Sequence, residues 1–472
     1  MSNKKVIEQP ALKDQVLKIY SEYSDQINGS EPDAIKRLRK RAAGYFADNG
    51  FPTERLEQWK STDILEALQH DYKVIMEPDF SGVDTDKLLQ CEIPDFDTLL
   101  FTELNGWYVS KNKPLTKFDN GAVVGSLAAA KKEYPEFFAR HYGKIADYRM
   151  NGLVAFNTAL AQDGMFIYVP DGVEMDKTIQ MVNVTQKNDY VLVHNRHLVV
   201  MGKNSKLKLV HCDDSTNQET SFTNSVTEVY MDEGADLDHY KLQNLNDNST
   251  LVNTSFFEQE ANSNLSTNAI TLNGGLIRNE AHVKLMGSHS NADVLGLYLV
   301  DKAQHVDNQV KIDHAVSDCT SNQHFKGITD DNAHAVFNGH ILVRKDAQRT
   351  QAYQNSKNIA ITDKAMIDAK PFLEIYADDV TCSHGATIGQ LDDEAMFYLK
   401  TRGLNEDDAR LLLMYAFAAD IVNHIKIEPL KDRIDDLVKK RLRGELSVCD
   451  QCVLHCKHPE KSYSFEIDMS KI

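Results

Sequence analysis

The feature that most constrains the fold is a repeat in the middle of the chain. Short apolar or alternating stretches such as HLVVM, KLKLV and VTEVYM are separated by turns rich in Asn, Asp, Gly and Ser. Aligned on a small residue, four turns share the order polar or Gly, small, polar, apolar, and the small residue recurs after 30, 28 and 29 positions, at 204–207, 234–237, 262–265 and 291–294. A repeat of this length predicts a solenoid, because one unit cannot bury its apolar face without a stacked neighbour.

The strand pattern favours a parallel β-helix over a β-sandwich. Later copies of the turn, around Ala333 and Ala347, are less regular. A sandwich would show many hairpin turns of the Asn-Gly kind, and only Asn273-Gly274 and Asn338-Gly339 are of that kind. No helix-length pattern interrupts the strands for roughly two hundred residues, so the helical crossovers of a doubly wound sheet are missing.

Helical periodicity appears on both sides of this region. We expect a mostly helical segment at 1–145, a β-helix core at 146–388, a helical domain at 389–446 and a Cys-rich tail at 447–472. Pro32 fits the first turn of an early helix that ends at Gly50. Near the other end, Asn405 can cap a helix, with Asp408 in the capping-box position. The body of that helix, 409–425, is apolar on more than one face and requires burial on two sides.

The charge balance limits the classes of partner. Lys and Arg number 52 against 70 Asp and Glu, giving a net charge of −18, which disfavours nucleic acid and anionic membrane surfaces. The chain begins without an apolar segment and nowhere carries eighteen apolar residues in a row, so we expect a soluble, cytoplasmic protein. It has no GxxxxGK[ST] motif, so any use of ATP would need another subunit.

The candidate site residues are a thiol and an imidazole in a late strand. Cys382 and His384 lie two residues apart in EIYADDVTCSHGATIG, and such residues share one face of a strand. Thiolate and imidazole both bind iron and zinc. Residue types alone favour a packed core strand over a site, because free Cys is often buried and a single His is often satisfied by a hydrogen bond.

Four separated blocks resemble the SufD branch of the SufB/SufD family, which forms the scaffold of the SUF iron-sulfur cluster assembly system. They are RLEQWKSTDI (55–64), FNTALAQDGMFIYVPDG (156–172), GHILVRKDAQRTQAYQNSKNIAIT (339–362) and EIYADDVTCSHGATIGQLDDEAMFYLKTRG (374–403). Cys382 and Gly385 resemble the SufD side, since the SufB side carries a Glu-His-Glu sequence there, and the imidazole position is common to both.

The resemblance implies a right-handed parallel β-helix flanked by helical regions, and a noncatalytic scaffold. It implies pairing with a SufB-like paralogue and docking of a SufC-like ABC ATPase, with a transient iron-sulfur cluster at the SufB–SufD interface. His384 would be the first candidate ligand and Cys382 the second. The candidate ATPase-docking residues are Tyr398, Arg402, Leu404, Asn405 and Asp407.

The remaining hypotheses concern the tail and the class of protein. Cys449, Cys452 and Cys456, with His455 and His458 beside them, could hold zinc or a cluster, or could do nothing in a flexible tail. A self-paired homodimer is an alternative assembly. A β-helix enzyme acting on polysaccharide is a weaker alternative, since the acidic pairs at 213–214, 330–331 and 378–379 are expected mainly at turns.

Overall fold

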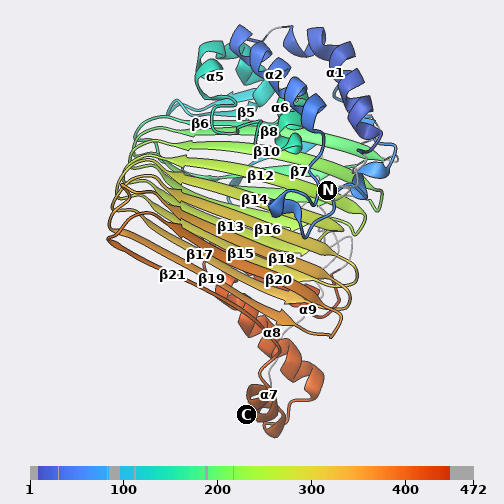
Figure 1. The fold of residues 1–472 in the computed structure, drawn as a ribbon, viewed down its shortest axis with the longest axis vertical. Coiled ribbons are helices and arrows are strands. Elements are labelled where there is room, and N and C mark those ends of the chain that lie inside the picture. The colour runs from blue at the N-terminus through green and yellow to red at the C-terminus, as the bar shows by residue number, and fades with distance from the viewer. Residues whose placement is uncertain are drawn as a thin grey trace, which may run out of the picture.

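Two long sheets face each other across a shared core and form a parallel β-solenoid (Figure 1). The computed structural model describes residues 9–29, 31–81, 83, 96–110, 113–186, 190–215 and 217–446. From β6 to β21 each coil contributes one strand to each sheet, so a strand pairs with the strand two places away in the sequence. These pairings are parallel throughout. The prediction of a mainly β protein with a parallel β-helix core is confirmed.

The even-numbered strands of the coils form one sheet, which we call sheet A. They are β6 (Met165–Val169), β8 (Val191–Met201), β10 (Ser221–Met231), β12 (Ser249–Gln259), β14 (Leu276–Leu285), β16 (His305–His314), β18 (His334–Val343) and β20 (Met366–Ile375). The odd-numbered strands form sheet B. They are β7 (Thr178–Thr185), β9 (Lys206–Ser215), β11 (Asp236–Asn244), β13 (Asn264–Asn273), β15 (Asn291–Val300), β17 (Thr320–Thr329), β19 (Thr350–Ala360) and β21 (Val380–Gly389).

The small residues of the repeat are buried at the corners that lead from sheet A to sheet B. Ser205, Ala235 and Ser263 occupy equivalent corner positions, as the alignment of the repeats within this chain predicts. The fourth copy differs, because Asn264 pairs with Asn291, which makes Ser290 rather than Ala292 the corner residue. One coil later the position is held by Cys319, whose Sγ lies 3.3 Å from Ser290 Oγ.

The first 145 residues are less helical than expected. The described helices there are α1 (Leu12–Asn28), α2 (Asp33–Asn49), α4 (Leu127–Glu133), α5 (Pro135–His141) and the short η1 (Glu57–Trp59) and η2 (Ala67–Gln69). The strands are β1 (Lys73–Val74), β2 (Thr98–Leu104), β3 (Trp107–Val109), β4 (Leu115–Lys117) and β5 (Val123–Ser126). Strands β2 and β5 pair directly with the first coil, so this segment closes the N-terminal end of the solenoid.

A further helix, α6 (Gly152–Leu160), lies where the sequence pattern predicts the start of the β region. All nine of its residues are buried, between α2 and the first strands of sheet A. A helix buried on every side has no polar face, so it shows no 3.6-residue periodicity. Gly50, with φ of 66°, ends α2 as predicted.

The segment around η1 is attached to the outer face of sheet A. The Arg278 guanidinium lies 3.7 Å from the centre of the buried Trp59 ring. Thr62 Oγ1 donates to Asp307 Oδ2 over 2.6 Å and lies 2.9 Å from His305 Nε2. The RLEQWKSTDI block therefore fastens the N-terminal region across successive coils of the solenoid.

The C-terminal helices α7 (Asp393–Thr401), α8 (Glu406–Val422) and α9 (Glu428–Leu442) follow β21. Figure 1 shows α7 beyond the last coil, away from the sheets. Helix α8 is buried on two sides, as expected, but one of them is the outer face of sheet B, where Ala418 and Ile421 join a cluster with Leu297 and Ile328. Helices α8 and α9 thus share a hydrophobic core with the solenoid and do not pack only against each other.

Candidate functional site

The candidate site lies in the terminal coil, formed by β20 and β21. Among the described residues, each of these strands has a neighbour on one edge only, β18 and β19 respectively. Because no further coil covers them, their inward-facing side chains stand at an open mouth of the lumen, the space between the two sheets. Eight of the ten residues of β21 are exposed. An uncovered strand edge of this kind is a template for pairing with another chain.

Cys382 and His384 lie side by side on the lumen face of β21. Cys382 is half-buried and packs against a small apolar cluster that includes Ile341, Val343 and Ala352 from the preceding coil. His384 points the same way by strand alternation, is in register with Gln354, and is exposed. The structure thus brings the predicted pair together at the mouth and leaves the imidazole accessible.

The chemistry of this pair is that of two incomplete metal ligands. Burial raises the pKa of the Cys382 thiol, so the group is protonated until a cation displaces the proton. Within the described residues no group of three or more His, Cys, Asp and Glu side chains is placed to hold a metal ion. One thiol and one imidazole can therefore supply part of a coordination shell, and the rest would have to come from outside.

Gly385 is in the middle of β21, which continues to Gly389. A Cβ built at Gly385 would meet nothing within 4 Å. The backbone of the strand is therefore accessible at this point.

Sequence reasoning missed a pair of glutamines behind His384. Gln354 Nε2 donates to Gln323 Oε1 over 2.5 Å, and both side chains are buried in the lumen. They belong to β19 and β17, in the same column as His384. The Ala-Tyr-Gln sequence of the 339–362 block contains Gln354 and was the available signal. Only the register between β19 and β21 shows that Gln354 lies beside His384.

Exposed apolar side chains surround the terminal coil. Met366, Phe372, Ile375, Tyr376 and Ile388 are between 39% and 60% exposed, which accounts for half of the exposed large hydrophobic residues in the described part of the chain. Concentration of such residues in one place is typical of a contact surface.

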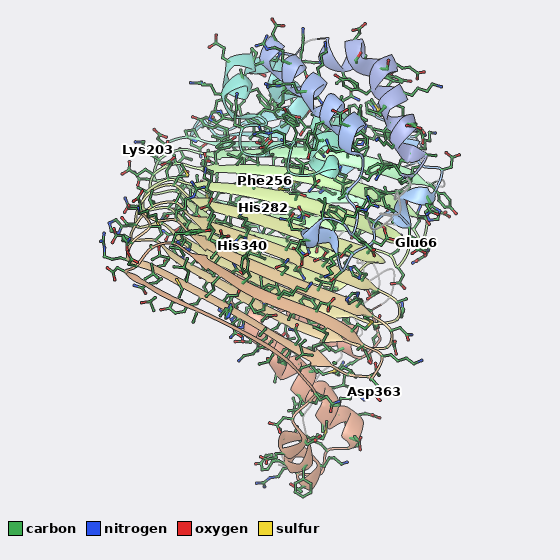
Figure 2. The ribbon with its side chains drawn as sticks, in the orientation of Figure 1. Glu66, Lys203, Phe256, His282, His340 and Asp363 are labelled. Carbon is green, nitrogen blue, oxygen red and sulfur yellow. The ribbon has the colours of Figure 1, made fainter. Side chains whose placement is uncertain are left out.

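A column of aromatic side chains on the outer face of sheet A leads to this coil, and it begins beneath the N-terminal helices, where Phe256 packs with Val154 of α6. Figure 2 shows Phe256, His282 and His340 following one another down the sheet. The rings of Phe256 and His282 stack at 5.1 Å, and those of His340 and Phe372 lie 4.5 Å apart. His340 Nε2 lies 3.1 Å from Glu374 Oε2, so these imidazoles have local partners and form an outer column separate from the lumen pair.

The predicted ATPase-docking residues lie on α7 and the turn after it. Tyr398 is 56% exposed, its ring lies under the Arg402 guanidinium at 5.0 Å, and no residue of α7 is buried. Asn405 caps α8 by accepting from the Asp408 backbone N–H, as predicted, and both Asn405 and Asp407 are exposed. Leu404 is half-buried.

The other cysteines do not join the site. Cys212 is buried beneath α8 and α9, in the cluster that they form with sheet B, as a packed thiol. Cys319 is a corner residue and is fully buried. Cys91 and the tail residues Cys449, Cys452 and Cys456 fall outside the described residues, so a tail metal site stays a prediction.

Charged groups inside the lumen lie far from the mouth. Asp213 accepts from Asn183 and pairs with Lys241 Nζ at 3.1 Å, with His211 alongside. Burial is the main reason that the pKa of His211 is lowered to about 3. The His211 imidazole is therefore neutral. The acidic pairs were expected mainly at turns. The pair 213–214 lies within strand β9, whereas the pairs 330–331 and 378–379 lie outside the strands.

No helix among the described segments is both long enough and apolar enough to cross a membrane.

Comparison with known proteins identifies the family. Residues 183–417 match the model of the SUF system FeS cluster assembly, SufBD core domain, and residues 11–181 match that of the SufBD protein N-terminal region. An iron-sulfur cluster assembly SufBD family protein of Synechocystis is 28% identical over 88% of this chain and 93% of its own length. The iron-sulfur cluster assembly proteins SufD of Escherichia coli and Bacillus subtilis are 28% and 26% identical, over 84% and 88% of this chain and 90% and 95% of their own. With both family models matched in order and the SufD-like terminal coil in place, the chain belongs to the SufBD family of iron-sulfur cluster assembly proteins.

Proposed function

We propose that the chain is a noncatalytic scaffold subunit of a SUF-type complex, which pairs end to end with a SufB-like paralogue through its terminal coil. The observation that carries this proposal is the open lumen mouth, where β20 and β21 each have one edge without a partner strand among the described residues and where the exposed apolar residues gather. Parallel strands with free edges and an apolar rim are suited to continuation by the strands of a second solenoid.

The nascent iron-sulfur cluster is the cargo of this assembly. His384 and Cys382 would contribute two ligands at the seam, and the paralogue would contribute the others. The half-buried, protonated Cys382 and the exposed His384 support a division of roles in which the imidazole meets the cargo first.

An ABC-type ATPase of the SufC kind would dock on α7 and the turn at 402–407. The support is that α7 buries none of its residues and exposes Phe397 at 70% and Tyr398 at 56%, while Asp393 and Glu394 make its first turn acidic. Large exposed aromatic residues with a charged border are typical of the centre of a protein interface.

Copurification tests this function. Isolated from its native cytoplasm, the full chain is expected to bring a SufC-like ATPase and a SufB-like paralogue. His384→Ala should leave that complex assembled while cluster formation falls, and Tyr398→Ala with Phe397→Ala should release the ATPase alone. Unchanged cluster yield in His384→Ala would remove the imidazole from the site.

A self-paired homodimer is a second assembly that the same open mouth supports, because the paralogue and a second copy would use the same strand edges. Sedimentation of the isolated chain separates the two. A dimer that dissociates on addition of the paralogue would favour the heterodimer as the working form.

A further inference from the structure

The side-chain amide of Gln354 makes a hydrogen bond through one of its two polar atoms only. Its Nε2 donates to Gln323 Oε1, but its Oε1 is buried without a hydrogen-bond partner. The side chain is 3% exposed. A buried amide oxygen left unpaired costs about 1–3 kcal/mol, so a position that keeps one requires an explanation.

The register directs this oxygen toward His384. Gln323, Gln354 and His384 are consecutive members of one inward-facing column on β17, β19 and β21. Neighbouring strands lie about 4.8 Å apart. Because the two atoms of an amide diverge from Cδ, an Nε2 that points back to Gln323 leaves Oε1 on the side of the next coil, which carries His384.

Space for the glutamine comes from the opposite sheet. A Cβ at Gly339 on β18 would lie 1.7 Å from Gln354 Nε2 and 2.6 Å from Gln323 Oε1. The absence of a side chain at 339 therefore allows Gln354 to reach across the lumen. Two members of the 339–362 block thus act together in three dimensions.

We propose that Gln354 is a positioning residue for His384, a proposal that rests on the proposed role of His384 as a cluster ligand. Gln354 Oε1 makes no hydrogen bond in the structure, and it would accept the N–H of the lumen-facing ring nitrogen when the exposed His384 imidazole turns toward it. This contact fixes the tautomer and leaves the other nitrogen unprotonated and directed out of the mouth, where a metal can bind. Ligating imidazoles commonly depend on such a second hydrogen bond, and its loss costs on the order of 10–100-fold in metal affinity or activity.

The test is the tautomer of His384 in the full chain labelled with ¹⁵N-histidine, with the signal assigned from His384→Ala. At alkaline pH, where imidazole is neutral, the wild type is expected to show one tautomer. Gln354→Met, which keeps the length but has no acceptor, should show two. Gln354→Glu should restore one, because its carboxylate accepts and the unpartnered Gln323 Nε2 can turn to donate to it.

Gln351→Met is the matched control, since Gln351 lies on the same strand with its side chain exposed on the outer face. It should leave the tautomer unchanged. Gly339→Ala is an independent route to the same effect, because the new methyl group displaces the end of a flexible side chain and should also give two tautomers. A single tautomer in Gln354→Met and Gly339→Ala would overturn the proposal.

Cluster formation in the assembled complex separates this inference from the function on which it rests. We expect a roughly tenfold lower rate in Gln354→Met, with near wild-type rates in Gln354→Glu and Gln351→Met. If His384→Ala retains full cluster yield, the proposed function fails even where the tautomer responds to Gln354. If His384→Ala abolishes yield but Gln354→Met changes neither tautomer nor rate, only the positioning role fails.

Discussion

Glu31 is a buried carboxylate whose ionisation is coupled to folding. It is buried and accepts from Arg39 and Lys131, each at 2.7 Å. Arg39 also donates to the carbonyl groups of Thr158, Ala159 and Ala161 at the end of α6. Burial raises the pKa of Glu31, but the two cations outweigh this and lower it to about 2.

Because the pKa of Glu31 is lower in the folded state than in the unfolded chain, the stability it contributes is present above about pH 4.5 and is lost as the pH falls toward 2. Glu31→Gln removes that dependence. The difference in free energy of unfolding between wild type and Glu31→Gln should shrink by about 2 kcal/mol from about pH 5 to about pH 3 in urea titrations. Glu22→Gln, at an exposed position of α1, should track the wild type over this range.

At the scale of single elements, the corner position explains a cysteine that the sequence left without a role. Serine occupies the equivalent corner in three other coils, at Ser205, Ser263 and Ser290. Cys319→Ser should therefore change the free energy of unfolding by less than about 1 kcal/mol.

Cys319→Leu overfills the same corner, where the side chain is fully buried, and should cost about 1–3 kcal/mol. Urea denaturation of both variants measures the contrast. Equal destabilisation by serine and leucine would show that the thiol itself, and not its size, is required.

Helix α8 is held to sheet B by a charged contact at its C-terminal half. Lys326 Nζ lies 2.7 Å from Asp420 and donates to the Phe417 carbonyl, and His324 lies 3.4 Å from the same carboxylate. Asp420→Asn should weaken this attachment by about 1 kcal/mol, since the carboxylate is 45% exposed and solvent screens it. Faster amide hydrogen exchange in the second half of α8 measures the effect, and Asp407→Asn should leave exchange there unchanged.

Sequence reasoning succeeded where one element carries its own pattern. Strand alternation was enough to place Cys382 and His384 on one face, and the Asn405 cap follows from local spacing. It failed where the length of a turn sets the pairing register. The corner residue of that coil is Ser290 and not Ala292, and this difference changes which residues of the two neighbouring strands pair. It failed at α6 because complete burial removes the amphipathic pattern. Gln354 could not be assigned from sequence, since its relation to His384 depends on the register between strands.

For the whole molecule, the exposed terminal coil predicts how the chain associates. Ile388→Lys places a charge in the apolar rim, where Ile388 is 53% exposed, and desolvating that charge opposes contact with a second solenoid. Sedimentation velocity should show a large loss of pairing with the paralogue or with a second copy. Leu56→Lys, at a 45% exposed position in the N-terminal region, is the control and should pair normally. Equal pairing by both variants would place the interface elsewhere.

The two ends of the solenoid differ, and the difference predicts the stoichiometry of the proposed assembly. At the first coil, β2 to β5 pair onto both sheets, with antiparallel strands at the outer positions. At the last coil, β20 and β21 pair with no further strand among the described residues. A solenoid with unpaired strands at both ends can add copies at each end and form fibres. A solenoid with one end covered can add a partner only at the other end. Removing β2 to β5, which cover the first coil, should therefore convert a discrete pair into a growing filament.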